Sequence, residues 1–444
     1  MSFPPHTSYK PSGYDWLGNI PSDWRIQKFR HLFRESSEKI ESDVFGEMLS
    51  VSGYRGIERK EYDDENRRRK DEDLIGYRIV RRGQLVVNTM WLNYAGLGFS
   101  DLDGHVSPAY RAYWPRSEES SRYLHYLLRS EFYVKGYTRL LTGVRPNSLQ
   151  MSRDNMMSFP VILPDRQEQL AIASFLDRET AKIDALIAEQ QRLIELLQEK
   201  RQAVISHAVT KGLNPDAPMK DSGVEWLGEV PEHWEVSRLG WIAEQVNDIN
   251  HEMPEAVHSG VPFLSAKDLD NDGTMNFEND IKQISEADFI RLSQKIKPER
   301  GDIIYSRIGT IGRAALVDTD ERFLVSYSCC VIRVRRQNIH LRFLRDLLAS
   351  DLILTESKAR TRSMGQPDLG LGEIRKFPTP IPPIEEQKAI DHYLTRKIGE
   401  LDAVCSKTAA CLNLLQERRS ALISAAVTGQ IDVRGLATEE EEEA

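Results

Sequence analysis

The order of apolar and polar positions in the first half of the chain returns in the second half. In both halves a glycine leads into a β-branched run, at residues 83–88 and again at 301–306, and this pattern predicts a strand. Leucines spaced by three and four residues then predict a short amphipathic helix at 122–130 and at 342–350. We therefore expect each half to contain a globular part of roughly 150 residues with both α and β structure.

Two long helical patterns follow these globular parts. They lie within residues 161–213 and 379–430, and both close with Ala-Val-Thr before a glycine. About 45 residues at 1.5 Å each give a helix of roughly 65 Å, and a narrow apolar stripe on such a helix needs a partner helix. The expected partner is the other copy, running antiparallel. The stripes expected to form this spacer and to bind partner subunits contain Leu176, Ile183, Leu186, Ile187, Leu193, Leu197 and Val204 in the first helix, and Leu394, Leu401, Leu415 and Leu422 in the second.

Proline-containing segments separate each globular part from its helix. Proline fits neither the interior of a helix nor a central strand, so we expect Pro160 and Pro378 to act as hinges. Asp165 and Glu168 then have the spacing of a capping box, which predicts the start of the first helix.

The openings of the two halves carry the clearest repeat. Lys10-Pro-Ser-Gly-Tyr-Asp-Trp-Leu-Gly-Asn-Ile-Pro-Ser-Asp-Trp24 returns as Lys220-Asp-Ser-Gly-Val-Glu-Trp-Leu-Gly-Glu-Val-Pro-Glu-His-Trp234. Solenoid repeats have periods of roughly 20–50 residues, so this much longer period indicates a duplicated globular unit. Two such units tend to be related by a pseudo-two-fold axis, and they suit a target that has two halves.

These patterns predict a mixed α/β fold with two repeated recognition heads separated by two long antiparallel helices, in the form of a dumbbell. The expected parts are a first head at 1–160, a helical spacer at 161–213, a second head at 214–378, a second spacer helix at 379–430 and an acidic, disordered tail at 431–444.

The charge, the cysteines and the apolar runs limit the classes of function that fit the chain. The net charge is −9, and five of the negative charges stand together at residues 439–443, so any nucleic-acid surface must be local or supplemented by a partner. Cys329 and Cys330 stand in an apolar run, and none of the four cysteines has zinc-site spacing, so we expect buried, reduced thiols in a cytoplasmic protein. No apolar run reaches 18 residues, so no membrane span is expected.

Three motifs that recur in the same order give the chain a family resemblance. They are the paired Trp-Leu-Gly-x-[Ile/Val]-Pro-x-x-Trp openings, the Phe-Pro-x-x-x-Pro-x-x-x-x-Gln segments at 159–169 and 377–387, and the Ala-Val-Thr helix ends. With these motifs the chain resembles the specificity subunits of type I restriction-modification systems. The resemblance covers residues 10 to 430.

The resemblance implies a non-catalytic subunit. Its two heads would each read one half of an asymmetric, bipartite double-stranded DNA target, and its helices would act as a ruler between them. Two methyltransferase subunits would dock on the helical region, which includes Gln169 and Gln387, and two restriction-translocase subunits would join for cleavage. S-adenosylmethionine, ATP and Mg²⁺ would be bound by these partners, so no cofactor or metal is expected on this chain.

Candidate DNA contacts are Arg, Lys, Asn, Ser, Thr, Tyr, Trp and Gln side chains in loops at strand ends, because such groups suit phosphates and base edges. A solvated face for residues 67–70 and a structural turn for 143–148 remain open alternatives. The candidates are Tyr54, Arg55, Lys60, Arg67, Arg68, Asn88, Trp91, Arg145 and Asn147 in the first head, and Lys267, Ser306, Arg307, Thr310, Arg313, Arg362 and Gln366 in the second.

Other functions find less support in the residues. A methyltransferase would need Asn-Pro-Pro-[Phe/Tyr] or Asp-Pro-Pro-[Phe/Tyr], a phosphate loop would need GxxxxGK[ST], and a hydrolase elbow would need GxSxG; none of these occurs. A coiled-coil scaffold with two heads that do not bind DNA stays open, and so does a nonspecific DNA binder. The net acidity argues against the nonspecific binder.

Overall fold

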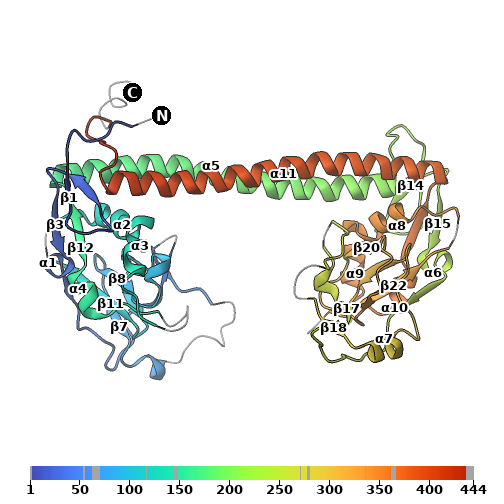
Figure 1. Ribbon diagram of the computed structural model, residues 1–444. Coiled ribbons are helices and arrows are strands. Elements are labelled where there is room, and N and C mark those ends of the chain that lie inside the picture. Colours follow the sequence, from blue (N-terminus) through green and yellow to red (C-terminus); the bar gives the residue numbers. More distant parts are fainter. Residues whose placement is uncertain are drawn as a thin grey trace. The chain divides into compact units, whose positions relative to one another are not determined.

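The computed structural model describes residues 3–53, 56–62, 71–116, 118–143, 149–270, 272–277, 281–335, 337–361 and 367–436 (Figure 1). The chain forms two compact units. Unit 1 comprises Met1–Gln191 together with Ala410–Ala444, and unit 2 comprises Arg192–Ala409. Two long helices, α5 (Arg166–Lys211) and α11 (Ile384–Val427), each contribute to both units. The mixed α/β fold class and the two long helices are therefore confirmed.

Unit 1 is built on two four-stranded sheets. The first is antiparallel and has the order β4 (Phe33–Glu35), β11 (Tyr110–Pro115), β8 (Leu85–Asn88), β9 (Leu97–Phe99). The second has the order β6 (Gly56–Arg59), β5 (Glu47–Ser52), β10 (Gly104–Val106), β7 (Arg78–Val80), with β5 and β10 parallel. Two ribbons flank them, β1 (Tyr9–Pro11) with β2 (Asn19–Pro21) and β3 (Arg25–Lys28) with β12 (Pro160–Leu163). The shorter helices are α1 (Phe29–Leu32), η2 (Asp71–Leu74), η3 (Leu92–Tyr94), α2 (Ser121–Arg129), α3 (Glu131–Thr138) and α4 (Arg153–Ser158).

Unit 2 repeats this plan. Its antiparallel sheet has the order β16 (Gln245–Asn247), β22 (Cys329–Arg333), β19 (Ile303–Ser306), β20 (Ala314–Leu316). A three-stranded sheet has the order β18 (Gln283–Ile284), β17 (Val261–Leu264), β21 (Leu324–Val325), with β17 and β21 parallel. The ribbons are β13 (Met219–Asp221) with β14 (Glu229–Pro231) and β15 (Glu235–Arg238) with β23 (Pro378–Ile381). The shorter helices are α6 (Leu239–Ile242), η5 (Ala266–Asp268), α7 (Glu286–Leu292), α8 (Leu341–Leu348), α9 (Asp351–Ala359) and α10 (Leu371–Arg375).

The strand and helix predictions agree with these elements. The glycine-led runs became β8 and β19, and the leucine-patterned helices became α2 and α8, whose apolar faces are buried. Cys329 and Cys330 are fully buried, as expected. Pro160 and Pro378 do lie in strands, but each strand belongs to a two-stranded ribbon, where a missing N–H costs little.

The core of each unit contains one end of each long helix. In unit 1, Leu176 of α5 and Val427 of α11 belong to the same cluster as the buried Trp24. In unit 2, Val209 of α5 and Leu394 of α11 belong to the cluster of the buried Trp234. The amphipathic helices are therefore stabilised by tertiary packing at both ends, rather than by helix propensity alone.

Within each unit the two long helices pack antiparallel. In unit 1, Arg419 of α11 donates to both carboxylate oxygens of Asp184 in α5, at 2.8 and 3.1 Å. In unit 2, Arg201 of α5 lies 3.7 Å from Asp402 of α11. Partly exposed pairs of this kind contribute little energy, so they indicate register more than they supply stability.

One glutamine in each unit holds the head to the start of a long helix. The Gln169 side chain accepts from the backbone N–H of Ser120 at 2.9 Å, and its amide donates to the carbonyl of Pro164 at 3.0 Å. Gln387 accepts from His340 at 2.8 Å and donates to Asn338 and Pro382 at 2.9 and 2.8 Å. Both side chains are fully buried. They were expected to bind partner subunits, but this burial leaves them no surface for one.

The expected capping box is half formed. The backbone N–H of Glu168 donates to Asp165 at 2.8 Å, so Asp165 caps α5 as predicted. The Glu168 carboxylate turns away from the cap, and its Oε2 accepts from the indole N–H of Trp24 at 3.1 Å. Glu168 therefore joins the helix start to the opening segment of the chain.

Candidate nucleic-acid interface

Three loops converge at one place in unit 1. The turn after β8 is bonded to the segment before α4, because the N–H of Met151 donates to the carbonyl of Thr89 at 3.0 Å. The tip of the β5–β6 hairpin joins them, since Arg129 donates to the carbonyls of Gly53 at 2.8 Å and of Ala95 at 3.3 Å. A side chain at Gly53 would collide with the carbonyl of Tyr94, so the close approach requires glycine.

Unit 2 brings the corresponding two segments together. The N–H of Leu369 donates to the carbonyl of Arg307 at 2.9 Å, in the position that Met151 and Thr89 hold in unit 1. The N–H of Gly309 donates to the carbonyl of Pro367, also at 2.9 Å. In both units the turn after the central strand therefore pairs with the segment that precedes the last short helix.

The exposed side chains on these loops differ between the units. In unit 1, Trp91 and Tyr94 are 54 % and 56 % exposed, and their rings lie 5.5 Å apart. In unit 2, Lys267 on η5 and Thr310 in the turn after β19 are exposed. Lys60 of unit 1 is exposed as well. It follows the end of β6, and its ammonium group lies over the ring of Tyr62. Two exposed aromatic rings on one turn are unusual, and Tyr94 was absent from the sequence-based candidates.

Arg307 was predicted to contact DNA, but the structure places it in the interior of unit 2. Its side chain is only 3 % exposed, and its guanidinium donates to Asp248 at 2.6 Å and to Asp368 at 2.7 Å. Burial raises the pKa of Asp248, but hydrogen bonds from Lys295 and Arg307 outweigh it, so the pKa lies below its usual value. Arg307 therefore holds three segments of unit 2 together and has no free donor surface for DNA.

Three further candidates are also engaged in the fold. The guanidinium of Arg313 donates to the carbonyl of Leu269 at 2.6 Å and so ties its turn to η5. Ser306 is fully buried and accepts from the N–H of Arg313 at 2.9 Å. Asn88 is buried at the end of β8 and accepts from the N–H of Met90 at 3.2 Å. These three polar residues do lie at strand ends or in the turns that follow, as the sequence predicted. Their hydrogen bonds, however, hold the turns in shape.

Several candidates lie outside the described residues. They are Tyr54, Arg55, Arg67, Arg68, Arg145, Asn147, Arg362 and Gln366. Three described residues that stand close to such segments in the sequence, Gly53, Gln150 and Pro367, belong to the convergent loops.

The helix stripes divide into buried and exposed residues. Leu176, Ile183, Ile187, Leu394 and Leu401 are buried, and Leu197, Val204, Leu415 and Leu422 are partly buried. Leu186 and Leu193 were expected in the same stripe, yet both are exposed, together with Leu196 of α5 and Val404 and Leu414 of α11. Both helices thus carry a second apolar set that the described parts of the units leave uncovered.

Comparisons with known proteins agree with this organisation. Residues 231–403 match the family model described as "Type I restriction modification DNA specificity domain". Among curated relatives, the EcoBI specificity subunit of Escherichia coli is 26 % identical over 254 residues, which are 54 % of this chain and 51 % of that subunit. The MjaVIII specificity subunit of Methanocaldococcus jannaschii is 24 % identical over 320 residues, 71 % of each chain.

A solved structure has a similar fold. The chain, reported in work on assembly and conformational transition of the type I restriction-modification system, has a TM-score of 0.60 and 16 % identity, and the match covers 93 % of this chain and 99 % of that one. Within the described residues no helix is both long and apolar enough to cross a membrane. Residues 231–403 thus match a type I restriction modification DNA specificity domain, and the chain is similar to type I restriction enzyme specificity subunits.

Proposed function

We propose that this chain recognises an asymmetric, bipartite DNA sequence for a type I restriction-modification complex and is itself non-catalytic. The observation that carries the proposal is the pair of convergent loop sites. The antiparallel sheets of the two units have the same strand order, and their loops have the same backbone pairing, but the loops present different side chains. A repeated frame with different exposed groups suits two different half-sites better than one palindrome.

The chemistry of the exposed groups supports a role in base contact. Trp91 and Tyr94 offer apolar and stacking surfaces, whereas Lys267 and Thr310 offer hydrogen-bond donors for phosphates and bases. The sequence candidates outside the described part of the chain include further arginine, asparagine and glutamine residues. With a net charge of −9, the chain depends on local positive charge and on its partners for phosphate affinity.

The long helices are the proposed ruler and docking surface. Their buried stripes keep α5 and α11 paired within each unit. The exposed leucines at positions 186, 193, 196 and 414 are proposed to pack against two methyltransferase subunits, to which two restriction-translocase subunits are then added. Catalysis, S-adenosylmethionine, ATP and Mg²⁺ belong to these partners.

Selection from random DNA tests the proposal directly. The chain is purified with its methyltransferase partner, incubated with random duplexes at two salt concentrations, and the retained DNA is sequenced. The expected result is a split motif with a fixed gap that persists at the higher salt concentration. A nonspecific binder would retain all sequences and lose them as salt rises. A scaffold would retain none at either concentration.

A further inference from the structure

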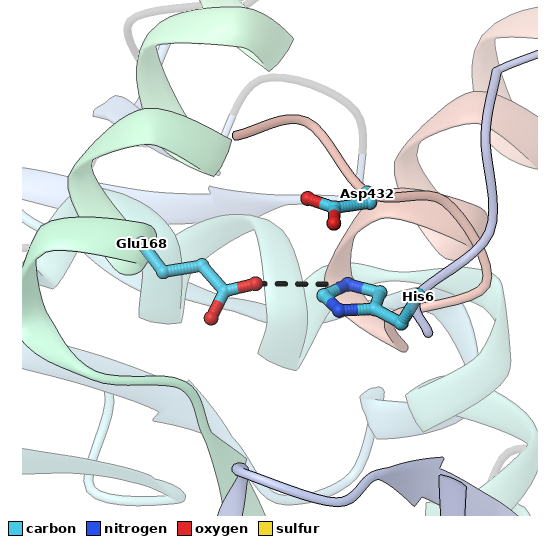
Figure 2. A group of neighbouring side chains, drawn as sticks. All are labelled: His6, Glu168 and Asp432. Atoms are coloured by element: carbon cyan, nitrogen blue, oxygen red, sulfur yellow. Dashed lines mark ion pairs between the residues drawn. The ribbon is translucent and has the colours of Figure 1, made fainter. Parts of the chain in front are cut away.

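Three segments that are far apart in the sequence meet beside the start of α5 in unit 1. They are the opening segment with His6, the first turn of α5 with Glu168, and the segment after α11 with Asp432 (Figure 2). Their backbones are joined as well. The N–H of Asp432 donates to the carbonyl of Pro4 at 2.7 Å, and the hydroxyl of Tyr9 donates to the carbonyl of Gly429 at 3.0 Å. The side chains are therefore held at fixed positions by the surrounding fold.

Two polar atoms in this cluster lack a hydrogen-bond partner although they are buried. They are Nε2 of His6 and Oε1 of Glu168, in side chains that are only 3 % and 2 % exposed. The two atoms face each other at 3.6 Å, beyond hydrogen-bond distance (Figure 2). A buried polar atom without a partner costs about 1–3 kcal/mol. The arrangement therefore favours a ligand that both atoms can bind.

The neighbouring groups leave these two atoms free and oriented. The other carboxylate oxygen of Glu168 accepts from the indole N–H of Trp24, and Nδ1 of His6 lies 3.4 Å from a guanidinium nitrogen of Arg434. These contacts fix the orientation of both side chains.

Arg434 makes only a long ion pair with Glu168 and no hydrogen bond to its Oε1. Its guanidinium is bonded to Asp432 at 2.7 and 2.9 Å, and its Nε lies 3.9 Å from Oε1 of Glu168. Oε1 of Glu168 is therefore left without a hydrogen-bond donor.

We propose that His6, Glu168 and Asp432 bind one divalent transition-metal ion of the Zn²⁺ class. One nitrogen and the carboxylate oxygens lie within 4.8 Å of one another, and Zn²⁺ is bound at about 2.0–2.2 Å by such groups. Imidazole suits Zn²⁺ better than Mg²⁺ or Ca²⁺, which prefer sites made of oxygen alone. Arg434 would stay on Asp432 as its outer partner, and it already contacts the carboxylate of Asp23 at 3.4 Å.

The ion would have a structural role. Its three ligands come from the opening segment, the helix start and the segment after α11, so the ion would fasten both of these segments to α5. Since a metal that binds only the folded state adds to its stability, the ion would resist fraying of both segments.

The second half of the chain provides an internal control. Glu386, which corresponds to Glu168, is partly exposed and accepts a hydrogen bond from His233 at 2.7 Å. Counted back from the matching residues Lys10 and Lys220, the position of His6 is occupied by Asp216. Replacing Glu386 therefore alters a histidine–glutamate pair that is not part of the proposed site.

The test is a Zn²⁺ titration of the full chain in competition with a chromophoric chelator. Cys405 and Cys411, whose thiols are partly or fully exposed, are first replaced by serine so that they do not bind the ion. We expect one equivalent of bound Zn²⁺. His6→Ala should weaken it at least about tenfold, because even outer-shell partners contribute about 10–100-fold. Asp432→Asn should weaken it too, and Glu386→Gln should leave it unchanged.

A thermal melt of the same variants separates loss of the site from loss of the fold. Added Zn²⁺ should raise the melting temperature of the parent chain and of Glu386→Gln, but not that of His6→Ala. If His6→Ala does not fold, Asp432→Asn, at a partly exposed position, provides the comparison. The proposal is overturned if the parent chain binds no equivalent of Zn²⁺, or if both ligand variants bind it as tightly as the parent.

Discussion

Arg307 has the chemistry of a DNA contact but lies in the interior of unit 2. A buried ion pair that loses one partner leaves an uncompensated charge, which costs about 3–5 kcal/mol. We expect Asp248→Asn to destabilise unit 2 by about this amount, because Arg307 and Lys295 both donate to Asp248. Urea unfolding followed by circular dichroism measures the change.

The matched control for Asp248→Asn is Lys267→Met. Lys267 is exposed on η5, so its replacement should change the free energy of unfolding by no more than about 0.5 kcal/mol. Equal stability of Asp248→Asn and Lys267→Met would mean that the buried ion pair does not hold unit 2 together.

Trp91 is the described residue in unit 1 whose exposure most suggests contact with DNA. Its indole is half exposed beside Tyr94, so Trp91→Ala removes little buried surface. Hot-spot aromatic residues contribute about 2 kcal/mol or more to an interface, so DNA affinity should fall roughly thirtyfold. Fluorescence anisotropy with the selected duplex measures this loss.

Trp241→Ala is the control for Trp91. Trp241 is also exposed, but it lies on α6 and belongs to neither of the two segments that pair in unit 2. Its replacement should leave DNA affinity unchanged. If both tryptophan variants lose affinity equally, the loss for Trp91→Ala is no evidence that the unit 1 loops contact DNA.

His125 gives unit 1 a predictable pH response. Burial, followed by the charges of Arg129 and Arg122, lowers the pKa of His125 to about 3. In the unfolded chain the pKa is about 6.5, so below that pH the unfolded state binds a proton that the folded state does not. Stability should therefore fall as the pH decreases below about 6.5, by about 1 kcal/mol between pH 7 and pH 5.5.

The test compares the parent chain with His125→Asn, which keeps an acceptor for the N–H of Phe99 but does not titrate. Urea midpoints are measured at both pH values. The variant should lose less stability between them than the parent; an identical loss would assign the pH response to other groups.

At the scale of elements, the sequence predicts those strands and helices whose formation depends on residues close to one another in the chain. A glycine turn before Leu85 or Ile303 and a leucine pattern in α2 or α8 are local signals, and all of them became the expected elements. The partners of Arg307 could not be predicted in this way, because Asp248 and Asp368 approach it only after folding. The same is true of His6, Glu168 and Asp432, which belong to three distant segments.

The two long helices make the spacer testable. Seven residues inserted after Gln190 in α5, with seven more after Leu412 in α11, keep the apolar stripes in phase. The insertion adds roughly 10 Å, which corresponds to about 3 base pairs. We expect the selected motif to keep both half-sites and to gain a longer gap. A motif with altered half-site bases and the original gap would refute the ruler.

At the scale of the whole molecule, the duplication accounts for the regularity of the chain. Both units have the same strand order in their antiparallel sheet, a buried glutamine at the helix start and the same pairing of their loops. The exposed loop residues are not repeated. We propose that this repeated frame with different loops recognises two independent half-sites in one target.

The most direct measurement of that claim is a whole-genome map of methylated bases, made by long-read sequencing in a host with and without this gene. The neighbouring genes stay intact, and a third strain carries a chain whose unit 2 loops come from a relative. We expect a split motif that is methylated only when the gene is present, with one half altered in the third strain. A methylome that is the same with and without the gene, while its methyltransferase partner is expressed and bound, would contradict it.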